Sequence, residues 1–188
     1  LRVYAAVTGH PALSAADLDA LDALRAKYAD DPVFKTGAIT LDAANEGPAD
    51  LRAIVEELDA RGWQVIIRAI GEGAVQLARD AIEYASGTNP PSERPRRHRI
   101  EAADDGFERP GVVLAGTERR TLAQAVDAYT KDAAWASFDE HRKGSIERDM
   151  LADLVIFTHD LFAAPATAAT DADVAVTIFD GRVVYARS

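Results

Sequence analysis

Residues 62–102 limit most strongly what this chain can fold into, because two strand patterns flank a helical repeat there. Residues 65–69 form a short, mainly apolar run between glycines, which is typical of a buried parallel strand. Apolar side chains then recur at helical spacing over residues 74–85, and a proline-rich turn follows. Residues 98–102 complete the unit as the next strand. The stretch therefore predicts the strand–helix–strand crossover of an α/β protein.

Two further strand–helix pairs are predicted ahead of this unit. Strands are expected over residues 1–7 and 35–42, which are short apolar runs between loop residues. Ser14 is expected to cap the first helix, because its hydroxyl can accept a hydrogen bond from the first turn. The second helix is predicted over residues 49–60. Its apolar face is formed by Leu51, Ile54, Val55 and Leu58, and Glu56, Glu57 and Asp59 lie off that face.

The chain changes character near residue 150, where helical spacing gives way to β-like segments. Before that point, a helix capped by Thr121 is predicted over residues 121–138. Asp180 and Gly181 are expected to form the hairpin turn between the last two strands. We therefore expect one domain over residues 1–150 and strands of a second one over residues 151–188. The C-terminal strands are predicted over residues 152–158, 173–179 and 182–186.

The composition excludes some classes of partner. The 188 residues carry a formal net charge of −10, which argues against nucleic acids and acidic membranes, because both require a basic protein face. No apolar run approaches the roughly 20 residues of a membrane span. The chain has no cysteine, which excludes disulfides and thiolate metal sites. This composition is compatible with a reducing cytoplasm, and a cytoplasmic location is our expectation.

The strand–helix–strand unit also carries a family resemblance. Residues 62–72 read Gly-Trp-Gln-Val-Ile-Ile-Arg-Ala-Ile-Gly-Glu, and residues 97–103 read Arg-His-Arg-Ile-Glu-Ala-Ala. These segments resemble the amidohydrolase superfamily and, within it, amidohydrolase family 3. Members of that branch usually read Gly-x-Gln-Val-x-x-His-Ala-Ile-Gly-Asp in the first segment and Arg-His-Arg-Ile-Glu-His-Ala in the second. The flanking residues therefore match, whereas the two histidine positions do not.

The C-terminal half of the chain strengthens the resemblance. Lys-Gly-Ser-Ile at residues 143–146 and Leu-Ala-Asp-Leu-Val at residues 151–155 are similar to the segments where the family's chain leaves its barrel for a small β-sandwich. The resemblance implies an α/β fold, namely a partial or rearranged amidohydrolase-type TIM barrel with a small C-terminal β-sandwich layer. About five barrel strands can be assigned, the fifth at residues 112–115, against eight in a full TIM barrel. We therefore expect a truncated or degenerate member of the family.

The resemblance implies a chemistry as well. Active relatives are metal-dependent hydrolases of C–N bonds other than peptide bonds, and their two histidines hold a divalent ion such as zinc. This chain has Arg68 and Ala102 at those positions, and Thr40 where many relatives carry a lysine. A guanidinium repels a cation, and a methyl group has no ligand atom. We therefore expect no bound metal or other cofactor, and no hydrolase activity in this form.

The remaining candidates for a site at the former active-site end are Arg68, Glu101, His98, Glu72 and His10. Glu101 is expected either to pair with Arg68 across adjacent strand ends, so that a salt bridge replaces the lost metal charge, or to be solvated. His98 is interpreted as a structural strand residue and His10 as a solvated loop residue. Glu72 is interpreted as the cap of the helix that follows it.

Three functions stay open on the sequence. The first is a metal-free amidohydrolase relic that serves as a scaffold or binding module. The second is an active amidohydrolase with a rebuilt metal site, for which His10, His98 and Glu101 are the candidate residues. The third is a homo-oligomer in which two chains complete one barrel, because exposed sheet edges invite pairing with another chain. No substrate or other small-molecule ligand is indicated under any of them.

Overall fold

The computed structural model describes residues 2–29, 31–92, 94–103, 121–163 and 173–187. Contacts divide the chain into two compact units, Leu1–Gly116 and Thr117–Ser188, and each is described by itself. No helix among the described residues has the length and hydropathy needed to cross a membrane.

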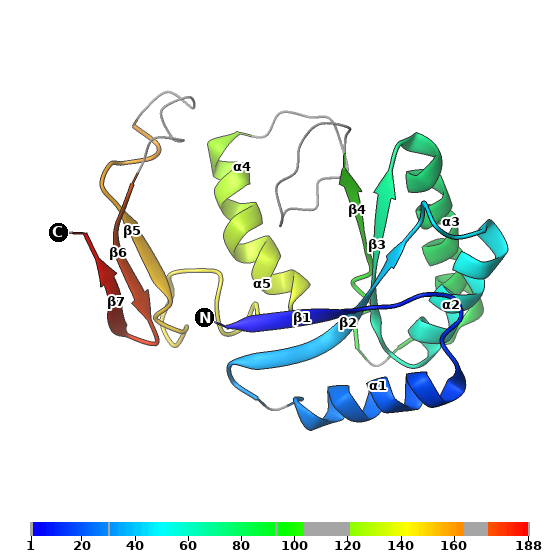
Figure 1. The fold of residues 1–188 in the computed structure, drawn as a ribbon. Helices are drawn as coiled ribbons and strands as arrows, with labels where there is room; N and C mark the ends of the chain where they lie inside the picture. Colours follow the sequence, from blue (N-terminus) through cyan, green and yellow to red (C-terminus); the bar gives the residue numbers. More distant parts are fainter. Residues whose placement is uncertain (1, 30, 93, 104–120, 164–172, 188) are drawn as a thin grey trace. The chain divides into compact units, whose positions relative to one another are not determined.

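The first unit is built on a four-stranded sheet with the order β1-β2-β3-β4 and parallel pairing throughout. Helices alternate with these strands, as Figure 1 shows. The predicted strand–helix–strand unit is confirmed, together with the two strand–helix pairs before it. The strands are β1 (Val3–Thr8), β2 (Phe34–Asp42), β3 (Gln64–Ile70) and β4 (Arg99–Ala103). The helices are α1 (Ala15–Lys27), α2 (Pro48–Ala60) and α3 (Glu72–Thr88).

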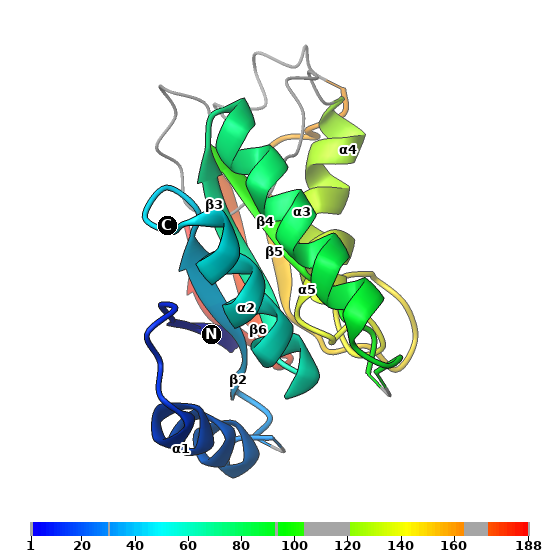
Figure 2. The same cartoon turned by 90° about the vertical axis from the view of Figure 1, so that its right-hand side faces the viewer.

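The core of this unit lies between the sheet and the helices α2 and α3, which cover one of its faces (Figure 2). Alternate residues of β2 and β3 point into this core, because successive side chains of a strand point to opposite faces. Each such buried side chain contributes roughly 1.5–3 kcal/mol to folding. The core includes Ile39, Leu41, Val65, Ile67 and Ala69 from the strands, Leu51, Val55 and Leu58 from α2, and Ala78, Ala81 and Ala85 from α3.

Helix α1 is attached through polar contacts as well as through apolar side chains. Of its side chains, Leu18 alone is buried among the described residues of the helix. Arg61, which follows α2, donates hydrogen bonds of 2.8 Å to the carboxylates of Asp19 and Asp22. The guanidinium of Arg25 lies 4.4 Å from the centre of the Trp63 ring. The cap predicted at Ser14 is confirmed, because its hydroxyl accepts a hydrogen bond from the first turn of the helix.

The predicted barrel is confirmed only in its coarser form, as an α/β fold with a parallel sheet. The four described strands do not close into a barrel, since β1 and β4 are the outer strands of the sheet within the described residues. Closing a barrel requires the first and last strands to pair. The predicted strand at residues 112–115 lies outside the described part of the chain. The partial barrel therefore stays a prediction.

The second unit begins with a helical segment that Thr121 caps, as predicted. The segment consists of α4 (Leu122–Asp127), the π-helical turn η1 (Ala128–Asp132) and α5 (Ala133–Ala136). The π-helical turn widens the helix in its middle, and the Thr130 hydroxyl donates a 2.6 Å hydrogen bond to the Val126 carbonyl there. The predicted helix is thus present, but it ends two residues before residue 138.

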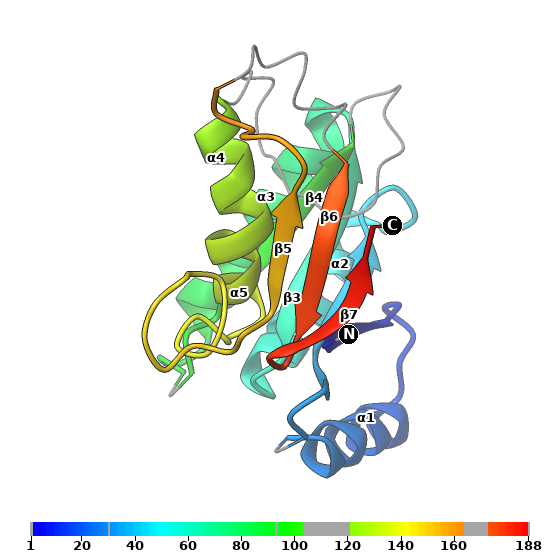
Figure 3. The ribbon, with the colours of Figure 1, turned by 90° about the vertical axis from the view of Figure 1, so that its left-hand side faces the viewer.

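An antiparallel sheet completes the second unit. Its strands are β5 (Leu154–Phe157), β6 (Val174–Phe179) and β7 (Arg182–Ala186), in the order β5-β6-β7 (Figure 3). The hairpin predicted at Asp180 and Gly181 is confirmed, and both residues have the positive φ that such a turn requires. This sheet corresponds to the predicted C-terminal β layer. A second layer that would make it a sandwich is not found among the described residues.

The division between the two compact units lies earlier in the chain than residue 150, and the domain boundary expected there stays a prediction. The helical segment belongs to the second unit, which starts at Thr117. The loop after α5 explains this difference, because it folds back on itself. Lys143 Nζ lies 3.1 Å from a carboxylate oxygen of the buried Asp139, and the Leu151 amide donates a 2.7 Å hydrogen bond to the Arg142 carbonyl. These contacts connect α5 to the segment that leads into β5.

Candidate functional site

The carboxyl ends of β2, β3 and β4 carry one row of charged residues. The strand register pairs Asp42 with Arg68, and Arg68 with Glu101. Paired residues of neighbouring strands lie on the same face of a sheet. Val65 and Ile67 belong to the core beneath α2 and α3, so Arg68 lies on the opposite face. The row therefore places a cation between two carboxylates on the face away from these helices.

The ion pair that we predicted between Arg68 and Glu101 is not formed, although the two residues share a face. Arg68 is exposed and makes no ion pair with a described residue. Glu101 lies 3.8 Å from Arg99 Nε, two residues earlier on the same strand. Asp42 accepts a 3.0 Å hydrogen bond from the Ala44 amide. The three charges are thus neighbours in the sheet without being joined to one another.

The former ligand positions do not fit a divalent metal ion. Arg68 supplies a cation where a neutral imidazole would be needed. Position 102 is in register with Ala69, whereas position 68 is in register with Glu101, so the two former ligand positions are not paired with each other. Thr40 is half-buried and is in register with Ile66. No three His, Asp or Glu side chains converge on a possible metal position in the described ranges.

His98 lies at the opposite end of β4 from the charged row. Its ring is buried, and Nε2 lies 2.9 Å from Asp59 Oδ1 at the end of α2. The same carboxylate accepts hydrogen bonds of 2.6 Å from Arg96 Nε and 2.8 Å from Asn89 Nδ2. We call these four residues the Asp59 network. It connects α2 to the segment between α3 and β4.

The protonation state of His98 follows from its second contact. The Val65 amide donates a 3.0 Å hydrogen bond to Nδ1, so Nδ1 carries no proton and Nε2 donates to Asp59. Burial lowers the pKa of His98, and the bond to Asp59 opposes this effect. Burial alone would raise the pKa of Asp59, but hydrogen bonds from Arg96, Asn89 and His98 together lower it. The network therefore joins a neutral imidazole to a carboxylate.

The prediction for Asp59 is wrong, because we expected this residue to lie off the apolar face of its helix. It is buried instead. The signal was present in the sequence: Asp59 lies four residues after Val55, and residues at this spacing share one side of a helix. Its hydrogen-bond partners lie 30 to 39 residues further along the chain, so they gave no local signal.

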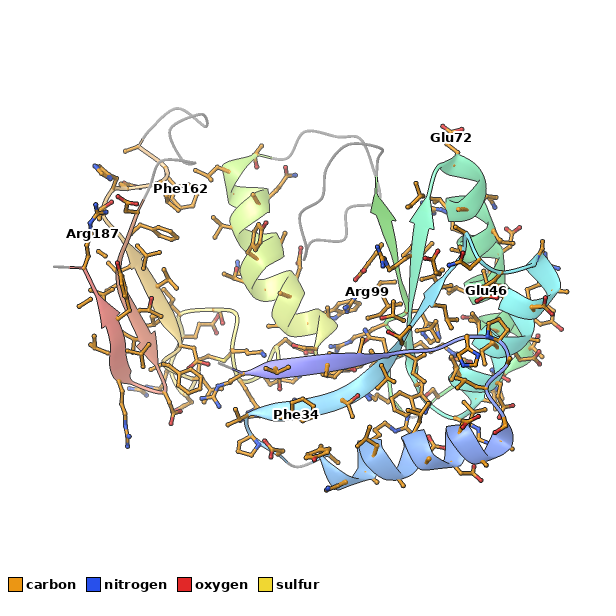
Figure 4. The ribbon with its side chains drawn as sticks, in the orientation of Figure 1. Phe34, Glu46, Glu72, Arg99, Phe162 and Arg187 are labelled. Atoms are coloured by element: carbon orange, nitrogen blue, oxygen red, sulfur yellow. The ribbon has the colours of Figure 1, made fainter. Side chains whose placement is uncertain are left out.

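The remaining candidates do not join the row. His10 is an exposed residue after β1. Burial raises the pKa of the nearby Glu46 carboxyl, and the charge of His10 acts in the opposite direction. His10 and His98 lie beyond opposite ends of their strands, so the described residues do not bring them together with Glu101. Glu72 is the exposed first residue of α3 (Figure 4), where Gly71 is the N-cap without a side-chain cap bond. Glu72 therefore does not cap this helix by a hydrogen bond.

Comparisons with known proteins agree on the kind of fold. Two solved structures resemble the chain, one an adenosine deaminase from Xanthomonas campestris with bound zinc and the other an uncharacterised protein. The first has a TM-score of 0.55 at 14% identity, covering 98% of this chain and 61% of its own. The second has a TM-score of 0.54 at 15% identity, covering 90% of this chain and 59% of its own. Both identities are low, so these likenesses concern the fold alone.

A sequence comparison finds a family similarity in the C-terminal half of the chain. No protein with a curated description matches the chain. The chain spans about three fifths of the length of the two solved structures, as their covered shares of 61% and 59% state. A model of the amidohydrolase family matches residues 97–185, which include β4 and all of the C-terminal sheet. Residues 97–185 are therefore similar to the amidohydrolase family.

Proposed function

We propose that this chain is an amidohydrolase-type domain, related to metal-dependent hydrolases of C–N bonds other than peptide bonds, and that it does not hydrolyse such bonds in the form given. The match of the amidohydrolase family model to residues 97–185 supports the first part. The second part rests on one observation, the position of Arg68 between Asp42 and Glu101 at the strand ends.

The argument is electrostatic. A hydrolytic metal site needs neutral or anionic ligands that converge on the ion and leave one position open for water. A permanent positive charge in the middle of the row repels a second cation, and guanidinium has no lone pair for coordination. Changing only a residue that supports a ligand costs about 10- to 100-fold in metal affinity or activity, so the loss of ligands costs more.

Metal content and hydrolysis test this proposal together. We expect protein purified without added metal to contain zinc, manganese and iron far below one ion per chain, and to leave simple amides and cyclic imides intact. Stoichiometric metal, with hydrolysis that stops on chelation and returns on readdition of the ion, would establish the alternative of an active enzyme with a rebuilt site.

Substitutions in the row provide a sharper test of the same argument. Arg68→His would place an imidazole between Asp42 and Glu101, and we expect it to create measurable zinc binding, detected by competition with a chromophoric chelator. Arg68→Gln is the matched control, since it removes the charge without adding a ligand nitrogen. Ala102→His should add no binding, because position 102 is in register with Ala69. Equal zinc binding by Ala102→His and Arg68→His would contradict the assignment.

A second candidate function, an oligomeric scaffold, is favoured by the C-terminal sheet. Its outer strands β5 and β7 expose several large apolar side chains, and contiguous apolar patches on soluble proteins commonly mark interfaces. We propose a second copy of this chain as the partner. Light scattering should then give a mass above that of one chain, and Val184→Lys should reduce it; a single-chain mass at all concentrations would exclude this candidate. The exposed apolar residues are Val155, Ile156, Val183, Val184 and Tyr185.

A further inference from the structure

Arg99, the first residue of β4, has a guanidinium that the described residues leave without a hydrogen-bond acceptor. Its Nε atom is enclosed and has no hydrogen-bond partner. Its one ion-pair contact within the described residues is Glu101, at 3.8 Å. Burial lowers the pKa of Arg99, because the charged form loses hydration that nothing fully replaces. An enclosed donor without an acceptor is costly, so this group is suited to a ligand that supplies one.

Two other arginines of the same unit have hydrogen-bond acceptors for their guanidinium groups. Arg96, three residues earlier, donates to the carboxylate of Asp59 and to the carbonyls of Asn89 and Pro90. Arg61 donates to the carboxylates of Glu57, Asp19 and Asp22. The three side chains are about equally exposed, with 26% of Arg99 accessible against 22% for Arg96 and 24% for Arg61. The missing acceptors of Arg99 therefore do not result from greater exposure.

A second guanidinium and a phenol lie near Arg99. Arg94 Nη2 lies 3.5 Å from Tyr4 Oη on β1. Burial raises the pKa of the Tyr4 phenol, and Arg94 and Arg99 both lie close enough for their charges to oppose this shift. Arg94 therefore contacts this hydroxyl, and the charge of Arg99 acts on it from the first residue of β4. The local charge is positive, in contrast to the net charge of −10 of the whole chain.

The absence of a side chain at Gly37 leaves room for this arrangement. A Cβ atom at Gly37 would lie 2.9 Å from Tyr4 Oη and 3.4 Å from Arg94 Nη1, so any larger residue would displace them. The strand register pairs Ile66 with Arg99, which places Arg99 on the sheet face away from α2 and α3. Figure 4 shows Arg99 beside β3 and β4, on the side away from α3.

From these contacts we propose that Arg99, Arg94 and Tyr4 form a binding site for a small oxyanion, a phosphate or a carboxylate group. Guanidinium presents a planar fork of N–H donors that matches the oxygens of such groups. The site lies toward the amino ends of the strands, whereas the charged row with Arg68 lies at their carboxyl ends. It does not include Arg68, so the metal content that tests the proposed function does not test this site.

Titration with inorganic phosphate and, separately, with acetate tests the site. The readout is the Nε–Hε resonance of Arg99 in ¹⁵N-labelled protein, at constant ionic strength maintained with chloride. We expect a saturable shift with at least one of the two anions, and the arm that saturates at the lower concentration identifies the preferred oxyanion. A linear shift with both anions, equal to that caused by chloride, would overturn the proposal.

Variants locate the binding on the named residues. Arg94→Gln should weaken binding at least tenfold, and Tyr4→Phe should weaken it several-fold because the ring remains and the hydroxyl is lost. Arg68→Gln is the matched control, since it removes an exposed arginine from the same sheet face, and it should bind as the unchanged protein does. Backbone amide shifts of β4 report whether each variant keeps its fold. Undiminished binding by a folded Arg94→Gln variant would contradict the site.

Discussion

Each of the two sheets contains a strand rich in β-branched residues, but the two strands differ in how far they are buried. In β3, Val65 and Ile67 are completely buried, with 0% of their surface exposed. In β7, Val183 and Val184 expose 63% and 60% of theirs. Both strands are rich in β-branched residues, and both pair with a neighbouring strand, although the pairing of β6 with β7 contains a register shift. The difference is that α2 and α3 cover β3, whereas the described residues put no comparable layer on β7.

This contrast shows that β-branched residues favour a strand without determining its burial. A pleated strand with Val and Ile forms in either setting, because these side chains suit an extended backbone. Stability then depends on what covers the strand. We infer that apolar packing and the Asp59 network hold the parallel sheet, whereas backbone hydrogen bonds contribute most in the antiparallel sheet. The following predictions test this inference.

The largest effect should come from the Asp59 network. Asp59→Ala removes a buried carboxylate that Arg96, Asn89 and His98 share, and it should lower the free energy of unfolding of the first unit by about 3–5 kcal/mol. The control is Asp173→Ala, which breaks the exposed ion pair with Arg187 and should cost less than about 1 kcal/mol. Amide hydrogen exchange measures both effects, unit by unit. Equal losses in the two variants would contradict the inference.

Core packing should give the next largest difference. Ile67→Ala creates a cavity beneath α2 and α3, and we expect it to destabilise the first unit by about 2–5 kcal/mol. Val183→Ala removes side-chain carbons that are already in water, and its effect should stay within about 0.5 kcal/mol. Denaturant titrations of both variants compare them directly. A large loss for Val183→Ala would mean that another chain covers β7.

The pH dependence of stability should distinguish the two units as well. The folded pKa of His98 lies below its unfolded value of about 6.5, so the unfolded chain binds more protons and stability falls as the pH drops below that value. Asp59 adds a further loss below about pH 4, because its folded pKa is also lowered. Each proton contributes at most about 1.4 kcal/mol per pH unit.

His98→Gln provides the control for this effect. It should flatten the stability of the first unit between about pH 6.5 and pH 5, although the unit becomes less stable throughout. Stability should be measured by thermal unfolding at several pH values with constant ionic strength. A profile that keeps its slope in the variant would show that another group titrates there.

Removing a helix cap should give the smallest difference between the two units. Ser14 and Thr121 both form a capping box, in which the hydroxyl and the side chain of the third helical residue exchange hydrogen bonds with the backbone. Substituting either by alanine should cost about 1 kcal/mol, because a cap depends on its own helix and not on the layers around it. Circular dichroism during urea unfolding can compare the two. Markedly different losses would show that the caps also depend on tertiary packing.

The elements were predictable because their signals are local. The spacing of Leu51, Val55 and Leu58 predicts the inward face of α2, and Asp180–Gly181 predicts the hairpin between β6 and β7. Pairing of Arg68 with Asp42 and Glu101 required a register, which no single segment contains. The environment of Arg99 on β4 likewise depends on Tyr4, which lies on β1 at the opposite edge of the sheet. Partners that lie far apart in sequence could not be inferred from spacing alone.

The missing ion pair between Arg68 and Glu101 has the same origin. The sequence predicted neighbouring strand ends correctly, but it did not indicate that Arg99 would lie nearer to Glu101 than Arg68 does. A pair of exposed charges gains little when both can be hydrated, so adjacency does not guarantee contact. Charge placement could therefore be predicted to the level of the strand, and side-chain pairing could not.

The hydrogen bond from the Val65 amide to His98 turns one backbone proton into a spectroscopic reporter. Protonation of Nδ1 would leave two N–H groups facing each other, so the Val65 amide must lose its acceptor when the ring becomes charged. Its chemical shift and its exchange with deuterated solvent should therefore follow the charge of a side chain 33 residues away in sequence. A single resolved resonance would record whether β3, β4 and α2 are still joined at that point.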